Sequence, residues 1–144
     1  MPLLDKMLAL AMAAQVLLTL GLLVWMGRER VPRVVRGEIR VADIAVEKDA
    51  YPLKARLLSN SFDNQFQLPL LFFVGALTAL LFGLLDWFTV GLAWLFVFLR
   101  YVHAAIHVTT NRVYRRFTAY VAGLAVLALF WLWLVLRLLL APSV

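Results

Sequence analysis

The chain has 144 residues, of which 65% are hydrophobic and 15% are charged, and its net charge is +6. This composition is far more apolar than the roughly half-apolar average of soluble domains, so it predicts a membrane protein without a soluble domain. The absence of cysteine excludes disulfides, thiolate metal ligands and a cysteine nucleophile. The basic residues gather beside apolar runs rather than among exposed aromatics, so no nucleic-acid partner is expected.

Four apolar stretches are long enough to cross a membrane, which takes roughly 20 helical residues for a hydrocarbon core of about 30 Å. They cover residues 7–26, 68–85, 88–108 and 118–140. We therefore predict an all-α membrane protein, a four-helix transmembrane bundle that forms a single domain over residues 1–144.

Lysine and arginine predict how the bundle is oriented. They are concentrated in a polar loop at residues 27–51 and in the short turn before the fourth span, whereas the connection after the second span offers only Asp86. Because basic loops stay on the cytoplasmic side, we expect both of them in the cytoplasm. Four spans then place both chain termini on the opposite side of the membrane.

The second helix is expected to start after Pro52 and to run from about residue 53 to 85, beyond the membrane at its cytoplasmic end. Pro69 lies inside this helix. A proline there removes one hydrogen bond of the helix and crowds the carbonyl of Gln65, so we predict a kink near the cytoplasmic membrane face.

Two polar stripes follow the cytoplasmic halves of the second and third helices. Spacings of three, four or seven residues place the members of each stripe on one helix face. The second helix carries Arg56, Asn60, Asp63, Asn64 and Gln67, and the third carries Arg100, His103, His107, Thr110, Asn111 and Tyr114. A charge at the centre of a membrane helix costs about 2.5–3.5 kcal/mol, so such groups face a bundle interior or a wet cavity. The stripes are expected to converge on one cavity.

These stripes allow more than one interpretation. Polar side chains can simply tie helices into register while arginines extend to lipid headgroups. The density of charge favours a multiply charged ligand instead. His103 and His107 have the spacing of two metal ligands, with Asp63 as a third candidate. No metal site is predicted, because the neighbouring Arg100 would repel a cation and no glutamate adjoins the pair.

Two segments carry a family resemblance. RLLSNSFDNQFQLPLLFF (56–73) and RYVHAAIHVTTNRVYRRFTAY (100–120) resemble MAPEG, the membrane-associated proteins in eicosanoid and glutathione metabolism. Four spans, a long basic first loop, a proline-bearing second helix and Arg-x-x-His in the third helix are similar to that family over most of the chain. The resemblance implies a homotrimer with glutathione sites between neighbouring subunits, open to the cytoplasm.

The resemblance also implies roles for individual residues. Arg116 and Tyr120 match the arginine and tyrosine that lie by the glutathione thiol, and they are the catalytic candidates. The candidates for binding glutathione are Arg56, Asn60, Asp63, Asn64, Arg100, His103 and His107.

The sequence departs from the family pattern at two places. Asp63 follows Asn60 where relatives have glutamate, and alignment on Pro69 puts Gln65 at that acidic position instead. His107 stands where relatives commonly have tyrosine. These departures suggest a bacterial-type member of the inner membrane whose substrate differs from that of the eicosanoid enzymes.

The resemblance implies a glutathione-dependent transferase or peroxidase that acts on lipophilic electrophiles. Guanidinium groups suit the two carboxylates of glutathione. A free thiol has a pKa of about 8.5, and a nearby cation such as Arg116 raises its thiolate fraction, with the Tyr120 hydroxyl as a second donor. The alternative is a non-catalytic bundle of the same fold that binds a lipid or a partner subunit in its basic cavity.

Overall fold

The computed structural model describes residues 1–45 and 48–141. Residues 46–47 of the predicted loop and residues 142–144 of the predicted domain lie outside this part of the chain. Every regular element in the described ranges is a helix. Four segments are long and apolar enough to cross a membrane, Leu3–Val35, Leu53–Leu81, Trp87–Val108 and Val113–Leu140, which confirms the predicted four-helix transmembrane bundle.

The first helix, α1 (Leu3–Val35), is longer than its predicted span. Its 33 residues correspond to about 50 Å, well beyond the roughly 30 Å of a hydrocarbon core. An ion pair of 3.0 Å between Arg33 and Glu29, one turn apart, supports the extension. The first part of the predicted polar loop is therefore helical. The chain leaves the helix at Gly37, whose φ of +72° suits a residue without a Cβ, and the loop then contains the short helix η1 (Val41–Ile44).

The second span is interrupted. It consists of α2 (Leu53–Asp63), a single 3₁₀ turn η2 (Asn64–Phe66) and α3 (Leu68–Leu81). Gln67, with φ −100° and ψ −102°, leaves the helical conformation between the two. The distortion lies where the kink was predicted, but it is a break, because Pro69 lies in the first turn of α3, where its missing N–H needs no partner, and so starts a new helix. The second span also ends at Leu81 rather than near residue 85.

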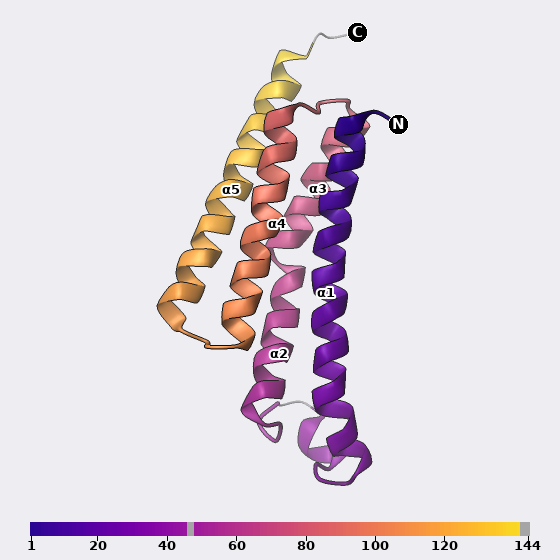
Figure 1. Ribbon diagram of the computed structural model, residues 1–144, viewed down its shortest axis with the longest axis vertical. Helices are drawn as coiled ribbons and strands as arrows, with labels where there is room; N and C mark the ends of the chain where they lie inside the picture. Colours follow the sequence, from indigo (N-terminus) through magenta and orange to yellow (C-terminus); the bar gives the residue numbers. More distant parts are fainter. Residues whose placement is uncertain (46–47, 142–144) are drawn as a thin grey trace.

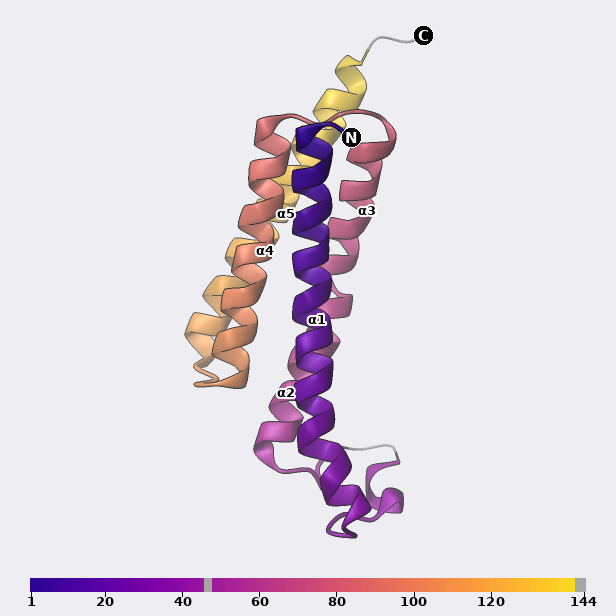
Figure 2. The same ribbon diagram turned by 45° about the vertical axis from the view of Figure 1, so that its right-hand side comes forward.

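The helix α4 (Trp87–Val108) lies in the middle of the bundle, with α1 and α5 (Val113–Leu140) on opposite sides of it (Figure 1). It packs on α1, α2 and α5. Figures 1 and 2 show the start of α1 and the end of α5 at one end of the bundle, here called the terminal end, and the end of α1 with η1 and the start of α2 at the other, the loop end.

Aromatic side chains hold the terminal half together. The Phe72 ring stacks on Phe96 at a centroid distance of 5.0 Å and lies 6.1 Å from Phe130. A Cβ at Gly75 would stand 2.7 Å from the Phe130 ring, so only glycine lets α3 approach α5 this closely. The close packing leaves α3 and α5 fixed to each other.

A polar cluster of Asp86, Thr89, Trp133 and Arg137 joins the start of α4 to α5 at the terminal end. The Asp86 carboxylate accepts hydrogen bonds from the backbone N–H and hydroxyl of Thr89, both at 2.7 Å, from Trp133 Nε1 at 3.1 Å and from Arg137 Nη1 at 2.8 Å. Burial alone would raise the pKa of Asp86, which precedes α4, but the hydrogen bonds from Thr89 and Trp133 and the charge of Arg137 together lower it. We call this group the Asp86 cluster.

Candidate functional site

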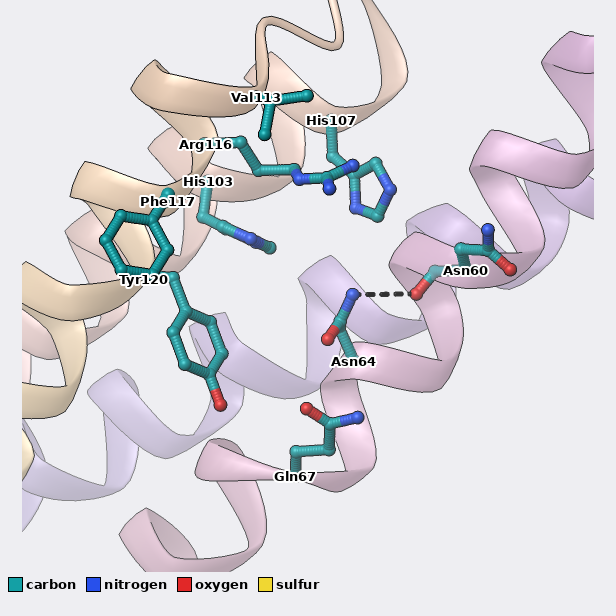
Figure 3. Close-up of a pocket in the computed structure, with 9 residues that line it drawn as sticks. All are labelled: Asn60, Asn64, Gln67, His103, His107, Val113, Arg116, Phe117 and Tyr120. Atoms are coloured by element: carbon teal, nitrogen blue, oxygen red, sulfur yellow. Dashed lines mark hydrogen bonds between the residues drawn. The ribbon is translucent and has the colours of Figure 1, made fainter.

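A cavity of about 400 Å³ lies between α2 with η2 on one side and the facing ends of α4 and α5 on the other (Figure 3). Its lining is mostly polar and consists of Asn60, Asn64, Gln67, His103, His107, Val113, Arg116, Phe117 and Tyr120. We call it the polar cavity. It lies in the half of α4 that approaches the loop end.

Two histidines of α4 form one wall. His103 and His107 are one helical turn apart, and their rings meet edge to face at a centroid distance of 5.7 Å. Each is only 3% exposed, and in the described part of the chain no group hydrogen-bonds to either Nδ1. Buried polar atoms normally have partners, so these two nitrogens are exceptions. The Tyr120 ring lies beside His103, with 5.8 Å between centroids.

Arg116 brings a positive charge into the cavity from the first turn of α5. Its Nη1 donates to the side-chain oxygen of Asn111 at 2.7 Å. Asn111 belongs to the turn between α4 and α5 and has a φ of +46°, a left-handed conformation that asparagine tolerates better than most residues. The turn thereby orients the guanidinium, which extends beside the His107 ring in Figure 3.

The opposite wall consists of amide side chains on α2 and the interruption that follows it. Asn64 donates from Nδ2 to the backbone oxygen of Asn60 at 2.9 Å, shown as the dashed line in Figure 3. Gln67 comes from the non-helical residue before α3. These amides present both donors and acceptors, which suits a ligand with peptide bonds.

Arg100 extends from α4 to the backbone of this wall and does not line the cavity. It is 1% exposed, and its Nη2 donates to the backbone oxygen of Asn64 at 3.0 Å. The described residues offer no partner for Nε and Nη1 and no carboxylate to pair with the charge. The site therefore contains a buried cation with an incomplete set of hydrogen bonds.

The structure brings together the predicted residues on the inner sides of the helices. Those that line the polar cavity are Asn60, Asn64, His103, His107, Arg116 and Tyr120. Arg56 and Asp63 do not line it, because they pair on the surface with Asp49 at 3.2 Å and with Lys48 at 2.5 Å, respectively.

Gln65, the other candidate for the acidic position, faces α1. Its Oε1 accepts from Gln15 Nε2 at 3.0 Å. Neither Asp63 nor Gln65 therefore lies at the polar cavity.

Two apolar lining residues, Val113 and Phe117, did not stand out from the sequence. Val113 lies three residues before Arg116, and Phe117 lies three residues before Tyr120, so helical periodicity from these two candidates could have identified them. Polarity and the family resemblance selected the other candidates and overlooked these two.

Metal ligands are sparse around the histidines. In the ranges that the structure describes, no group of three or more His, Asp or Glu side chains is placed to hold a metal ion. The third candidate, Asp63, is paired with Lys48 outside the cavity. The arrangement suits hydrogen bonding to an anionic, peptide-like ligand better than metal coordination.

A comparison with models of protein families identifies the family of the chain. A model described as the MAPEG family matches residues 8–139. The chain belongs to the MAPEG family. No curated protein and no solved structure matches it. Membership confirms the predicted resemblance and, together with four apolar helices, makes the protein an integral multi-pass membrane protein of a family associated with glutathione and eicosanoid metabolism.

Proposed function

We propose that the protein is a membrane-bound glutathione transferase or peroxidase that binds glutathione in the polar cavity and presents its thiolate to a lipophilic electrophile. The observation that carries the proposal is the unpaired Arg100 charge, 1% exposed, beside a cavity lined by His103, His107 and Arg116. Membership of the MAPEG family supports the choice of glutathione as the ligand.

The charge balance of the site favours an anion. Burying a cation without a counter-ion costs several kcal/mol. A bound anion reduces this cost. Arg100 is separated from the cavity by the Asn64 peptide, to which it donates a hydrogen bond. In a low-dielectric interior its field extends over that distance. The carboxylates of glutathione would supply the missing negative charge.

The amide wall and the histidines would contact different parts of glutathione. Asn60, Asn64 and Gln67 suit the two peptide bonds of glutathione. His103 and His107 line the facing wall and would contact its polar groups with their imidazole rings. The ligand would therefore lie across the cavity, between α2 and α4.

Arg116 and Tyr120 are the proposed catalytic residues. A hydrogen bond to a charged group contributes about 1.5–3 kcal/mol. Since one pKa unit corresponds to about 1.4 kcal/mol, such a bond to the thiolate would lower a thiol pKa of about 8.5 by one to two units. Much of the bound glutathione would then be ionised at neutral pH, and the thiolate is the nucleophile.

The assembly and orientation that we propose follow from the family and the charge pattern. We place the loop end in the cytoplasm of a bacterial cell and the protein in the inner membrane, because five arginines lie between residues 28 and 40. Glutathione would enter from that side and the lipophilic substrate from the bilayer. A homotrimer would let a neighbouring subunit complete the site.

The test is glutathione binding by the protein purified in detergent. We expect calorimetry to detect binding at millimolar glutathione and ultraviolet absorbance to show the bound thiolate. Arg116→Ala should abolish the thiolate signal. Arg115→Ala is the matched control, since Arg115 is the adjacent residue, has the same charge and is exposed outside the cavity. Absence of binding by the unmodified protein would contradict the proposal, and bound lipid without glutathione-dependent turnover would favour the non-catalytic alternative.

A further inference from the structure

A groove between α1 and α4 lies outside the polar cavity. It has a volume of about 320 Å³ and a floor of Gly21, Ala104 and Ala105 between Trp25 and Tyr101. His103 and His107 face the polar cavity instead. On α4, Ala104 lies one turn from His107 and shares its side of the helix, whereas Ala105 lies about 160° away. Gly21 belongs to α1, so a substitution there alters the groove without changing a residue of the polar cavity.

Small residues give the groove its depth. A Cβ built on Gly21 would meet no atom within 4 Å, so this position is open. The walls are held in place by their own bonds. Tyr101 donates its hydroxyl to the backbone oxygen of Ala14 at 2.7 Å, and Trp25 packs under the ammonium of Lys54, which stands 4.5 Å from the centre of its ring system. The result is an apolar trough with fixed aromatic sides.

The end of the groove nearest the loop is cationic. Lys54 of α2 donates to the backbone oxygen of Val108, the last residue of α4, which leaves two of its three ammonium hydrogens for other partners. A second hollow of about 540 Å³ shares Gly21 and Trp25 with the groove and continues along α1 to Arg28. In the described residues Arg28 forms no ion pair. Two cations thus lie at the mouth of an apolar trough.

We infer that this groove binds one anionic phospholipid. Its acyl chain lies over Gly21 and Ala104, at the depth of the hydrocarbon core. Its phosphate meets Lys54 and Arg28, where the tryptophan Trp25 marks the interface between hydrocarbon and headgroups. The charge complementarity selects an anionic headgroup over a zwitterionic one, because each basic residue near an anionic surface contributes about 1 kcal/mol.

The test compares phosphatidylglycerol with phosphatidylcholine of identical chains, each added to the full-length protein in detergent. We expect phosphatidylglycerol to raise the melting temperature in a saturable manner and to remain bound in native mass spectrometry at one lipid per chain. Phosphatidylcholine should produce a much smaller shift. Lys54→Gln should reduce the difference between the two lipids.

A pair of glycine variants separates the groove from general effects on the fold. Gly21→Leu fills the groove and should abolish the shift caused by phosphatidylglycerol. Gly91→Leu is the control, because Gly91 is also an exposed helical glycine whose Cβ would meet nothing within 4 Å, and it lies on α4 outside the groove. This variant should retain the shift.

Three outcomes would overturn the inference: equal shifts with both lipids, a full shift in Gly21→Leu, or a change of oligomeric state in Gly21→Leu, which would show that a second copy of the chain fills the groove. Glutathione binding by Gly21→Leu should equal that of the unmodified protein. Failure of the lipid site is thereby distinguished from failure of the proposed enzymatic function.

Discussion

The helix α4 has a polar cluster towards each end, and the two clusters differ in how completely their hydrogen bonds are satisfied. At the terminal end the Asp86 carboxylate accepts from Thr89, Trp133 and Arg137. Towards the loop end Arg100 and both histidines retain nitrogen atoms without partners in the described chain. A satisfied cluster stabilises the fold, whereas an unsatisfied one gains its stabilisation from a ligand. The comparison predicts that substitutions at the two ends will separate stability from binding.

Arg100→Met should have the largest effect on binding. We expect the glutathione dissociation constant to rise about tenfold, because the variant removes the positive charge whose field would reach the ligand carboxylates through the Asn64 peptide. The free energy of unfolding should stay the same or increase, since the variant removes an unpaired buried charge. Calorimetry and denaturant titration in detergent measure the two quantities.

Arg36→Met serves as the control, because Arg36 is exposed in the loop and far from the cavity in the fold. It should change neither quantity. If Arg100→Met lost stability and kept its affinity, the two clusters of α4 would not differ in the way described.

Asp86→Ala should show the converse behaviour. The free energy of unfolding should fall by about 1–3 kcal/mol, because the indole of Trp133 and the guanidinium of Arg137 both lose their acceptor. Glutathione affinity should not change, since the Asp86 cluster lies at the opposite end of α4. A loss of affinity equal to that of Arg100→Met would refute the separation.

Thr89→Val should have a smaller effect within the same cluster. It removes the hydroxyl that donates to Asp86 at 2.7 Å and keeps the backbone N–H that donates at the same distance. We expect a loss of about 1 kcal/mol in the free energy of unfolding. Thr118→Val, at an exposed position on α5, is a suitable control and should leave stability nearly unchanged. Equal effects of the two variants would show that the Asp86 bond contributes nothing measurable.

A change of pH near neutrality should have the smallest effect on the free energy of unfolding, because Asp86 stays ionised there. Its pKa is lowered in the folded state, because the hydrogen bonds from Thr89 and Trp133 and the Arg137 charge outweigh its burial. The stabilisation is therefore fully present above the unfolded pKa of about 3.9 and is lost as the pH falls through the folded pKa. As the pH falls, the free energy of unfolding of the unmodified protein should decrease more steeply than that of Asp86→Ala. An equal dependence on pH in the two proteins would contradict this assignment.

The sequence predicted the spans well because long apolar runs have one stable arrangement in a bilayer. The third span, predicted at residues 88–108, coincides closely with Trp87–Val108. A kink near Gln65 was predicted, but the complete break of the helix at 64–67 was not. Whether a proline bends a helix or begins a new one depends on tertiary contacts, and here the freed oxygen of Asn64 accepts from Arg100 on another helix.

Only part of the candidate site was predicted, because contacts with distant parts of the chain also decide which residues reach the cavity. Helical spacing correctly placed Asn60, Asn64, His103 and His107 on faces that meet across a cavity. It could not show that Asp63 and Arg56 turn towards the loop, because their partners, Lys48 and Asp49, approach only through the fold. Periodicity identifies which residues share a face, and loop partners decide which of them remain available.

The interruption at η2 divides one membrane span between two mechanical units. α2 packs on α1 and α4, whereas α3 packs on α1 and α5, stacks Phe72 on Phe96 of α4 and meets the Phe130 ring at Gly75. A ligand that draws Asn60 and Asn64 towards Tyr120 would therefore move α2 more readily than α3, because the break at η2 separates them. The terminal half of the bundle would stay rigid while the half near the loop closes around its ligand, with Gln67 as the joint between them.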